Sequence, residues 1–127
     1  MVEVSGNAPS LERNWKLLFP HVSERYILNM KEMFQNAIKD LDYRGDYTYC
    51  YCTKSSHFAF VLDEVLKNNV HIETSSAFDL PIIENLYLKN KIDFEKIIVC
   101  NGFKRPEYTS NIIRLINKGF KNLIPVL

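Results

Sequence analysis

The sequence has 127 residues, of which 46% are hydrophobic and 13% aromatic, which suffices for one domain with a buried core. Sixteen basic and fifteen acidic side chains leave a formal charge of +1 without a basic block, so a binder of nucleic acid or anionic membranes is not expected. The sequence shows no signal-peptide pattern and no apolar run near the roughly 18 residues of a membrane span. We therefore expect a cytoplasmic protein, and the odd set of three cysteines indicates reduced thiols.

The first part of the chain is expected to differ from the rest. Residues 1–14 are polar and aperiodic, and we expect a flexible lead-in there, with one domain over residues 15–127. A short strand is predicted from Trp15 to Val22, followed by a helix capped by Ser23. The helix is predicted to bury one face and to end near the turn at residues 43–46; that face comprises Ile27, Met30, Phe34, Ala37, Ile38 and Leu41.

From residue 47 onward a strand and a helix alternate. Strand-like runs begin near Tyr47, Val70, Ile97 and Leu123. Helix-like segments follow the first three runs, over residues 58–68, 78–89 and 106–118, with Ser76 and Pro106 at helix starts and Gly119 at a helix end. This alternation is typical of right-handed βαβ units around a parallel sheet.

Four such steps are half of an eight-stranded barrel. We therefore predict the α/β class and a partial (β/α)8 TIM-type barrel, with about four parallel βα steps. The sequence ends inside the apolar run Ile124-Pro125-Val126-Leu127, so we expect the N-terminal fragment of a barrel domain, truncated at the fourth strand.

Polar segments follow three of the predicted strands, and one of them contains Lys54. Functional loops of parallel α/β sheets lie beyond the carboxyl ends of the strands. Strand alternation places Cys50, Cys52 and Lys54 on one face, at the top of the barrel axis, and Tyr49 and Tyr51 on the other face. A partly desolvated lysine there would favour its neutral form, which reacts with aldehydes to give a Schiff base. The alternative is a lysine that extends into solvent at a strand end.

Other candidate residues also have two interpretations. Cys50 and Cys52 with His57 could belong to a metal site, but buried structural thiols are favoured because no fourth ligand is evident, and no metal is predicted. His57 is either a structural residue of a first helical turn or a contact to a pyridine ring or phosphate. Glu73 either caps a strand end or pairs with Lys54 or a cofactor. Asn101-Gly102 by itself indicates a turn.

Three segments together resemble one family, the biosynthetic arginine decarboxylases. The first segment is Tyr51-Cys52-Thr53-Lys54, and the second is the nine-residue run IETSSAFDL from Ile72 to Leu80. The third is the run from Ile98 to Lys104, which contains Cys100-Asn101-Gly102-Phe103 and is followed by Glu107-Tyr108. The family is similar to ornithine and diaminopimelate decarboxylases and uses pyridoxal 5'-phosphate in an alanine-racemase-like barrel. Three positions differ from the usual motif, with Cys52-Thr53 in place of Pro-Ile and Ser56 in place of an asparagine.

The resemblance implies a specific role for these residues. Lys54 would hold pyridoxal phosphate as an internal aldimine, and Glu73 would contact the cofactor. The implied reaction is the decarboxylation of arginine to agmatine and CO2, in polyamine and spermidine biosynthesis, by a full-length enzyme that is a homo-oligomer. The chain alone is expected to be inactive, since the family places further cofactor contacts outside these residues.

Three alternatives stay open at this stage. The substrate could be ornithine or diaminopimelate. The chain could be a non-catalytic partial barrel that binds a small ligand or a partner. A flavodoxin-like domain is the third, although the acidic cluster that it needs after the first strand is replaced here by hydroxyls and lysine.

Overall fold

Strands and helices alternate through the part of the chain that the structure describes. The computed structural model describes residues 23–126, so the predicted lead-in and the strand predicted from Trp15 to Val22 lie outside the described residues. No helix within this range combines the length and apolarity that a membrane crossing requires. The elements in chain order are α2 (Glu24–Asp40), β1 (Cys50–Cys52), α3 (Ala59–Leu66), β2 (His71–Thr74), α4 (Leu80–Leu88), β3 (Ile98–Cys100), α5 (Pro106–Lys118) and β4 (Leu123–Pro125).

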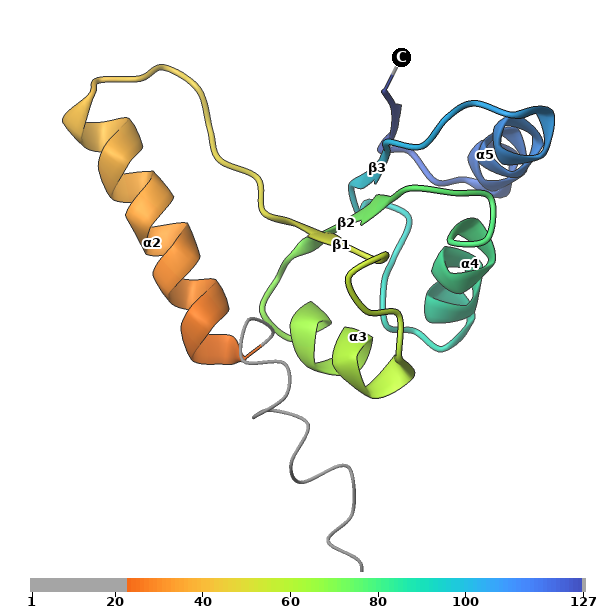
Figure 1. The fold of residues 1–127 in the computed structure, drawn as a ribbon, viewed down its shortest axis with the longest axis horizontal. Coiled ribbons are helices and arrows are strands. Elements are labelled where there is room, and N and C mark those ends of the chain that lie inside the picture. Colours follow the sequence, from red (N-terminus) through yellow and green to blue (C-terminus); the bar gives the residue numbers. More distant parts are fainter. Residues whose placement is uncertain (1–22, 127) are drawn as a thin grey trace, which may run out of the picture.

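The four strands form one parallel sheet in the order β1-β2-β3-β4. One row of the sheet aligns Tyr51 with Ile72, Ile98 and Leu123. Each crossover between neighbouring strands is a helix, and these helices are α3, α4 and α5. The predicted α/β class and the four parallel strands are confirmed. The sheet is compatible with part of a barrel, and the barrel itself stays a prediction (Figure 1).

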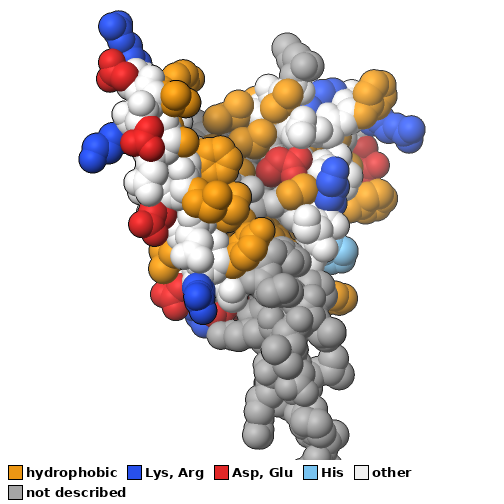
Figure 2. Space-filling view, turned by 60° about the vertical axis from the view of Figure 1, so that its left-hand side comes forward, with side chains coloured by type: hydrophobic (Ala, Val, Ile, Leu, Met, Phe, Trp, Pro, Cys, Tyr) orange, Lys and Arg blue, Asp and Glu red, His pale blue; other side chains and the backbone are white. Residues whose placement is uncertain are grey.

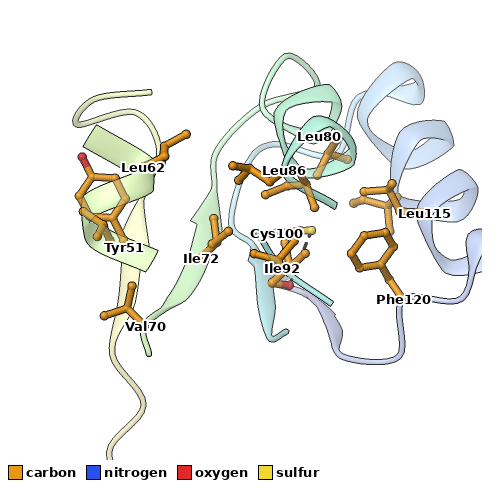
Figure 3. Close-up of a cluster of buried hydrophobic side chains, with 14 of the residues drawn as sticks. Tyr51, Leu62, Val70, Ile72, Leu80, Leu86, Ile92, Cys100, Leu115 and Phe120 are labelled. Atoms are coloured by element: carbon orange, nitrogen blue, oxygen red, sulfur yellow. Dashed lines mark hydrogen bonds between the residues drawn. The ribbon is translucent and has the colours of Figure 1, made fainter. Parts of the chain in front are cut away.

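The two faces of the sheet have different environments, as the strand alternation predicts. Tyr51, Ile72, Ile98 and Cys100 are buried in one cluster with side chains of α3, α4 and α5, such as Leu62, Leu80 and Leu115 (Figure 3). Cys50, Cys52, Glu73 and Val99 lie on the opposite face and are only half-buried. The bulky residues of β1 therefore pack against the helices, while its cysteines line the open face.

Helix α5 shows how its sequence specifies an amphipathic helix. Its buried side chains, Tyr108, Ile112 and Leu115, recur at the spacing of one helical face. Pro106 occupies the first turn, where its missing N–H costs no hydrogen bond, and Gly119 ends the helix with a left-handed φ of 112°. The predicted bounds of this helix are confirmed, whereas α3 and α4 are shorter than the predicted segments by one or more residues at each end.

The prediction that α2 buries a whole face is wrong for the described residues. Ile27 is its one buried side chain there, while Phe34 is 44% and Leu41 79% exposed. The helix stands apart from α3, α4 and α5 (Figure 1). Contacts from α2 to the rest include the stacked rings of Phe34 and Tyr47 and hydrogen bonds from Lys31 Nζ to two carbonyls before β2. Figure 2 shows hydrophobic side chains gathered on this side of the molecule.

Two adjacent isoleucines of α5 test the position of the core. Ile112 is 5% exposed and Ile113 is 52% exposed. We expect Ile112→Ala to lower the free energy of unfolding by about 2–4 kcal/mol, because it leaves a cavity. Ile113→Ala is the matched control and should cost less than about 1 kcal/mol. Urea unfolding measures both, and equal losses would contradict the packing described.

Candidate functional site

The loops that follow β1, β2 and β3 meet at one edge of the sheet. Hydrogen bonds continue the ladder past the strand ends, from Thr53 N to Glu73 O at 3.0 Å and from Asn101 N to Thr74 O at 2.8 Å. The three polar segments of the sequence are therefore neighbours in space, as predicted. This edge, which we call the carboxyl rim, consists of residues 53–58, 75–79 and 101–105.

Lys54 lies in a tight turn directly after β1. The turn is closed by a hydrogen bond from Ser55 N to Cys52 O at 3.1 Å, and Tyr51 Oη donates to Ser56 O at 3.0 Å. The Lys54 side chain is exposed, in contrast to the predicted desolvation, because the open face of the sheet gives it no cover within residues 23–126. Its ammonium forms no hydrogen bond or ion pair with any described residue.

Lys104, the other lysine of the carboxyl rim, is fully engaged. Its Nζ donates to Cys100 O at 2.8 Å, Gly102 O at 2.6 Å and Val126 O at 2.8 Å. An ammonium has three N–H donors, so these carbonyls use all of them. Nζ also lies 5.2 Å from the centre of the Tyr108 ring. Lys104 therefore joins the ends of β3 and β4 and is not free to react.

Glu73 lies on the open face beside β1. Its Oε1 accepts a hydrogen bond from Ser75 Oγ at 3.2 Å, and Ser75 Oγ lies 4.0 Å from Cys52 Sγ. Burial raises the pKa of the Cys52 thiol, and its hydrogen bond with Glu73 raises it further. Burial likewise raises the pKa of Cys50. Both thiols are therefore protonated at neutral pH, and Glu73 forms no ion pair with Lys54.

Asp79 organises the loop after β2, and sequence reasoning missed it. This carboxylate is 7% exposed, and its Oδ2 accepts hydrogen bonds from Ser75 N at 2.9 Å, Ser76 N at 2.8 Å and Ser76 Oγ at 3.0 Å. The sequence predicts Ser76 as the cap of α4. That prediction is wrong, since Asp79 stands at the N-cap position and its side chain reaches back to the loop. The Ser-Ser-x-x-Asp spacing was the available signal.

Gly102 allows the loops after β2 and β3 to touch. A Cβ atom at this position would lie 1.9 Å from Ser75 O, 2.4 Å from Ser75 C and 2.8 Å from a ring carbon of Tyr108. The Asn-Gly pair therefore does more than form the expected turn, because a side chain at Gly102 would separate two backbones. Only a hydrogen atom fits between them.

The Tyr108 ring packs beneath the contact of Gly102 with Ser75, and its hydroxyl group is hydrogen-bonded to Thr74. Tyr108 is 1% exposed, and its Oη donates to Thr74 O at 3.0 Å and lies 2.9 Å from Thr74 Oγ1. Burial raises the pKa of Tyr108 to about 12. The phenol is therefore a neutral, hydrogen-bonded structural group that ties α5 to the end of β2.

His57 and Ser56 complete the loop after β1. His57 is exposed and lines a hollow of about 370 Å³ between α3 and α4, together with residues such as Ala59 and Pro81. Ser56 is 6% exposed, and its Oγ has no hydrogen-bond partner among the described residues. Within residues 23–126 no three His, Cys, Asp or Glu side chains come together as a metal site would require.

Comparisons with known proteins identify one group of relatives. The chain is 30% identical over 115 residues to a biosynthetic arginine decarboxylase of Shewanella frigidimarina. This alignment covers 85% of this chain and 17% of that protein. It is 29% identical over 107 residues to the biosynthetic arginine decarboxylase of Vibrio cholerae, covering 80% of this chain and 16% of that one. An arginine decarboxylase of Solanum lycopersicum is 29% identical over 96 residues, covering 72% of this chain and 19% of the relative.

The predicted resemblance is therefore supported over most of this chain. The chain spans only 17% of the length of the first of these relatives. No protein-family model matches the chain, and no solved structure does.

Gly102→Ala tests the backbone contact. We expect a loss of about 3 kcal/mol or more in the free energy of unfolding, because Ser75 backbone atoms cannot move without breaking the ladder. Gly45→Ala is the control: the nearest atom to a Cβ there belongs to the ring of Tyr43, which is 65% exposed and able to turn away. A thermal or urea unfolding series in which both variants behave alike would contradict this account.

The two rim lysines give a second test. Lys104→Met removes three hydrogen bonds from a charged donor and should lower the free energy of unfolding by about 2 kcal/mol. Lys54→Met removes no such bond, so a change of less than about 0.5 kcal/mol is expected. Chemical denaturation compares the variants, and a large loss for Lys54→Met would show that its ammonium is engaged.

Proposed function

We propose that the chain is part of a pyridoxal-phosphate-dependent decarboxylase of the arginine decarboxylase family, with Lys54 as the residue that holds the cofactor. The observation that carries this proposal is the contrast between the two rim lysines. Lys54 presents an ammonium without a partner among residues 23–126 at the carboxyl end of β1, while Lys104 is bound by three carbonyls. The similarity to arginine decarboxylases, which covers 85% of the chain for one relative, supports this choice.

The surroundings of Lys54 fit a planar, polar cofactor. The adjacent open face is lined by the small side chains Cys50 and Cys52, so a ring could approach the sheet closely. Glu73 would contribute a carboxylate whose direction is set by its hydrogen bond from Ser75. The Lys54 amine would have to lose its proton before it could react with an aldehyde, and a cover over the open face would favour that loss.

Each of the residues described would have a separate role in such a site. When bound, pyridoxal phosphate supplies an electron sink for the pair left behind as CO2 departs. Lys54 would hold the cofactor, and the hydrogen bonds of Tyr51 and Ser55 would fix the turn that carries it. Asp79 would keep the neighbouring loop in place through its three hydrogen bonds.

The finer parts of the proposal extend to the whole enzyme. The substrate would be arginine, giving agmatine for polyamine synthesis, in a cytoplasmic homo-oligomer whose sheet closes into a (β/α)8 barrel. The names of the relatives favour arginine over ornithine and diaminopimelate. Decarboxylase assays on the protein that contains this chain, with each of the three amino acids, would decide the substrate.

A non-catalytic binding module is the second candidate. The exposure of Lys54 favours it, since a lysine that extends into solvent at a strand end needs no chemical role. A partial barrel of this kind would still bind a ligand at the carboxyl rim, but Lys54 would not become covalently modified.

Selective labelling separates the two candidates. The chain is incubated with one equivalent of pyridoxal phosphate, reduced with borohydride and digested, and each lysine peptide is quantified by mass spectrometry. We expect a pyridoxyl group on Lys54 in about tenfold excess over the exposed control Lys89, a preference of about 1.4 kcal/mol.

The variants provide the controls for this labelling. Lys54→Ala should remove the selective label, while Lys89→Ala should leave it unchanged. Equal labelling of all exposed lysines would refute a cofactor-holding role for Lys54 and favour the binding module.

A further inference from the structure

A second hollow lies on the carboxyl rim, away from Lys54. It has a volume of about 340 Å³ and is formed by the loop after β2 and by the loop that leads from β3 into α5. Its lining includes two phenylalanines from the two loops, Phe78 and Phe103, which are 80% and 85% exposed. No residue of the turn that carries Lys54 lines it. Two large aromatic side chains exposed beside one hollow favour binding of a planar or apolar group.

Two opposite charges line the same hollow. Arg105 stands at the N-cap of α5, and Glu107 lies in its first turn. Neither side chain forms an ion pair or hydrogen bond with a described residue. The other polar groups are already satisfied, because Ser76 binds Asp79 and Ser75 binds Glu73. Arg105 and Glu107 are therefore the charged groups that remain available to a ligand there.

The pairing of charges narrows the chemistry of that ligand. A simple anion would be attracted by Arg105 but repelled by Glu107. A simple cation would be attracted by Glu107 but repelled by Arg105. A small zwitterion satisfies both. An Arg guanidinium binds a carboxylate through paired hydrogen bonds, and a Glu carboxylate accepts from an ammonium.

We propose that this hollow binds a free α-amino acid with a planar side chain, at a site separate from Lys54. The ligand's carboxylate pairs with Arg105, its ammonium pairs with Glu107, and its side chain packs against Phe78 and Phe103. The proposal does not depend on the decarboxylase function, since no residue assigned to the cofactor lines the hollow.

Titration of the full chain with L-phenylalanine tests the site. Backbone amide shifts in 15N-labelled protein should change saturably at residues 75–78 and 103–108. Three probes each lack one feature of the ligand: N-acetyl-L-phenylalanine has no ammonium, L-phenylalaninamide has no carboxylate, and L-alanine has no planar side chain. The two blocked derivatives should each bind more weakly by about fivefold, the upper end for one exposed ion pair. L-Alanine should also bind more weakly, because it cannot pack against the two phenylalanine rings.

Variants assign the contacts. Arg105→Ala and Glu107→Gln should each weaken L-phenylalanine binding by about fivefold. Phe103→Ala should also weaken binding, because it removes a ring that packs against the ligand, and it should leave the chain folded because that ring is 85% exposed. Arg44→Ala and Glu32→Gln change exposed charges outside the hollow and should leave affinity unchanged. Lys54→Ala should also bind normally.

Several outcomes would overturn the proposal. If the unmodified chain does not bind L-phenylalanine, the proposal is wrong. If L-phenylalanine and its blocked derivatives bind equally, the hollow is an apolar patch that does not recognise the charges of the ligand. Loss of binding in Lys54→Ala would show that the amino acid occupies the proposed cofactor site instead. Loss of binding in Arg44→Ala and Glu32→Gln would show that the affinity does not come from the charges that line the hollow.

Discussion

The carboxyl rim depends on a backbone contact that admits no side chain. Gly102 lies against the Ser75 carbonyl so closely that a Cβ atom would stand 1.9 Å from its oxygen. This contact holds the loops after β2 and β3 together, and Tyr108 fills the space beneath it with hydrogen bonds to Thr74. The Asp79 carboxylate fixes the Ser75 side of the contact through three hydrogen bonds. This packing fixes the backbone of the two loops that carry the rim's polar side chains.

Two lysines on the same rim have different roles because their surroundings differ. Lys104 donates to three carbonyl oxygens at and beyond the ends of β3 and β4, and one of them, Cys100 O, also accepts from Val126 N at 3.0 Å. Lys54 stands on a turn whose backbone is already hydrogen-bonded, and its ammonium contacts no partner in the described part of the chain. A free amine on a well-held turn is the arrangement that a covalent cofactor requires, and it is the basis of the proposed role.

The sheet has one buried and one open face, and this division arranges the chemistry. Side chains of β1 and β2 that point to the helices, such as Tyr51 and Ile72, form the core (Figure 3). Those that point the other way, Cys52 and Glu73, meet beside the Lys54 turn. Arg105 and Glu107, at the start of α5, line a separate hollow with two exposed phenylalanines. The rim thus carries the Lys54 turn and, apart from it, a hollow formed by the two neighbouring loops.

The order of strands and helices, their parallel pairing and the face to which Tyr51 turns were predictable from the sequence by itself, because they follow from local periodicity and from helical crossovers between strands. The motif around Lys54 also identified the candidate lysine. The extent of burial on α2 was not predictable, since an apolar stripe specifies a face but not what covers it. Asp79 binds its own loop, so the Ser-Ser-x-x-Asp spacing was a local signal for its role. Lys104 and Gly102 have roles that only the tertiary structure decided, because each meets a backbone carbonyl more than twenty residues away, and a sequence pattern does not specify such a backbone contact.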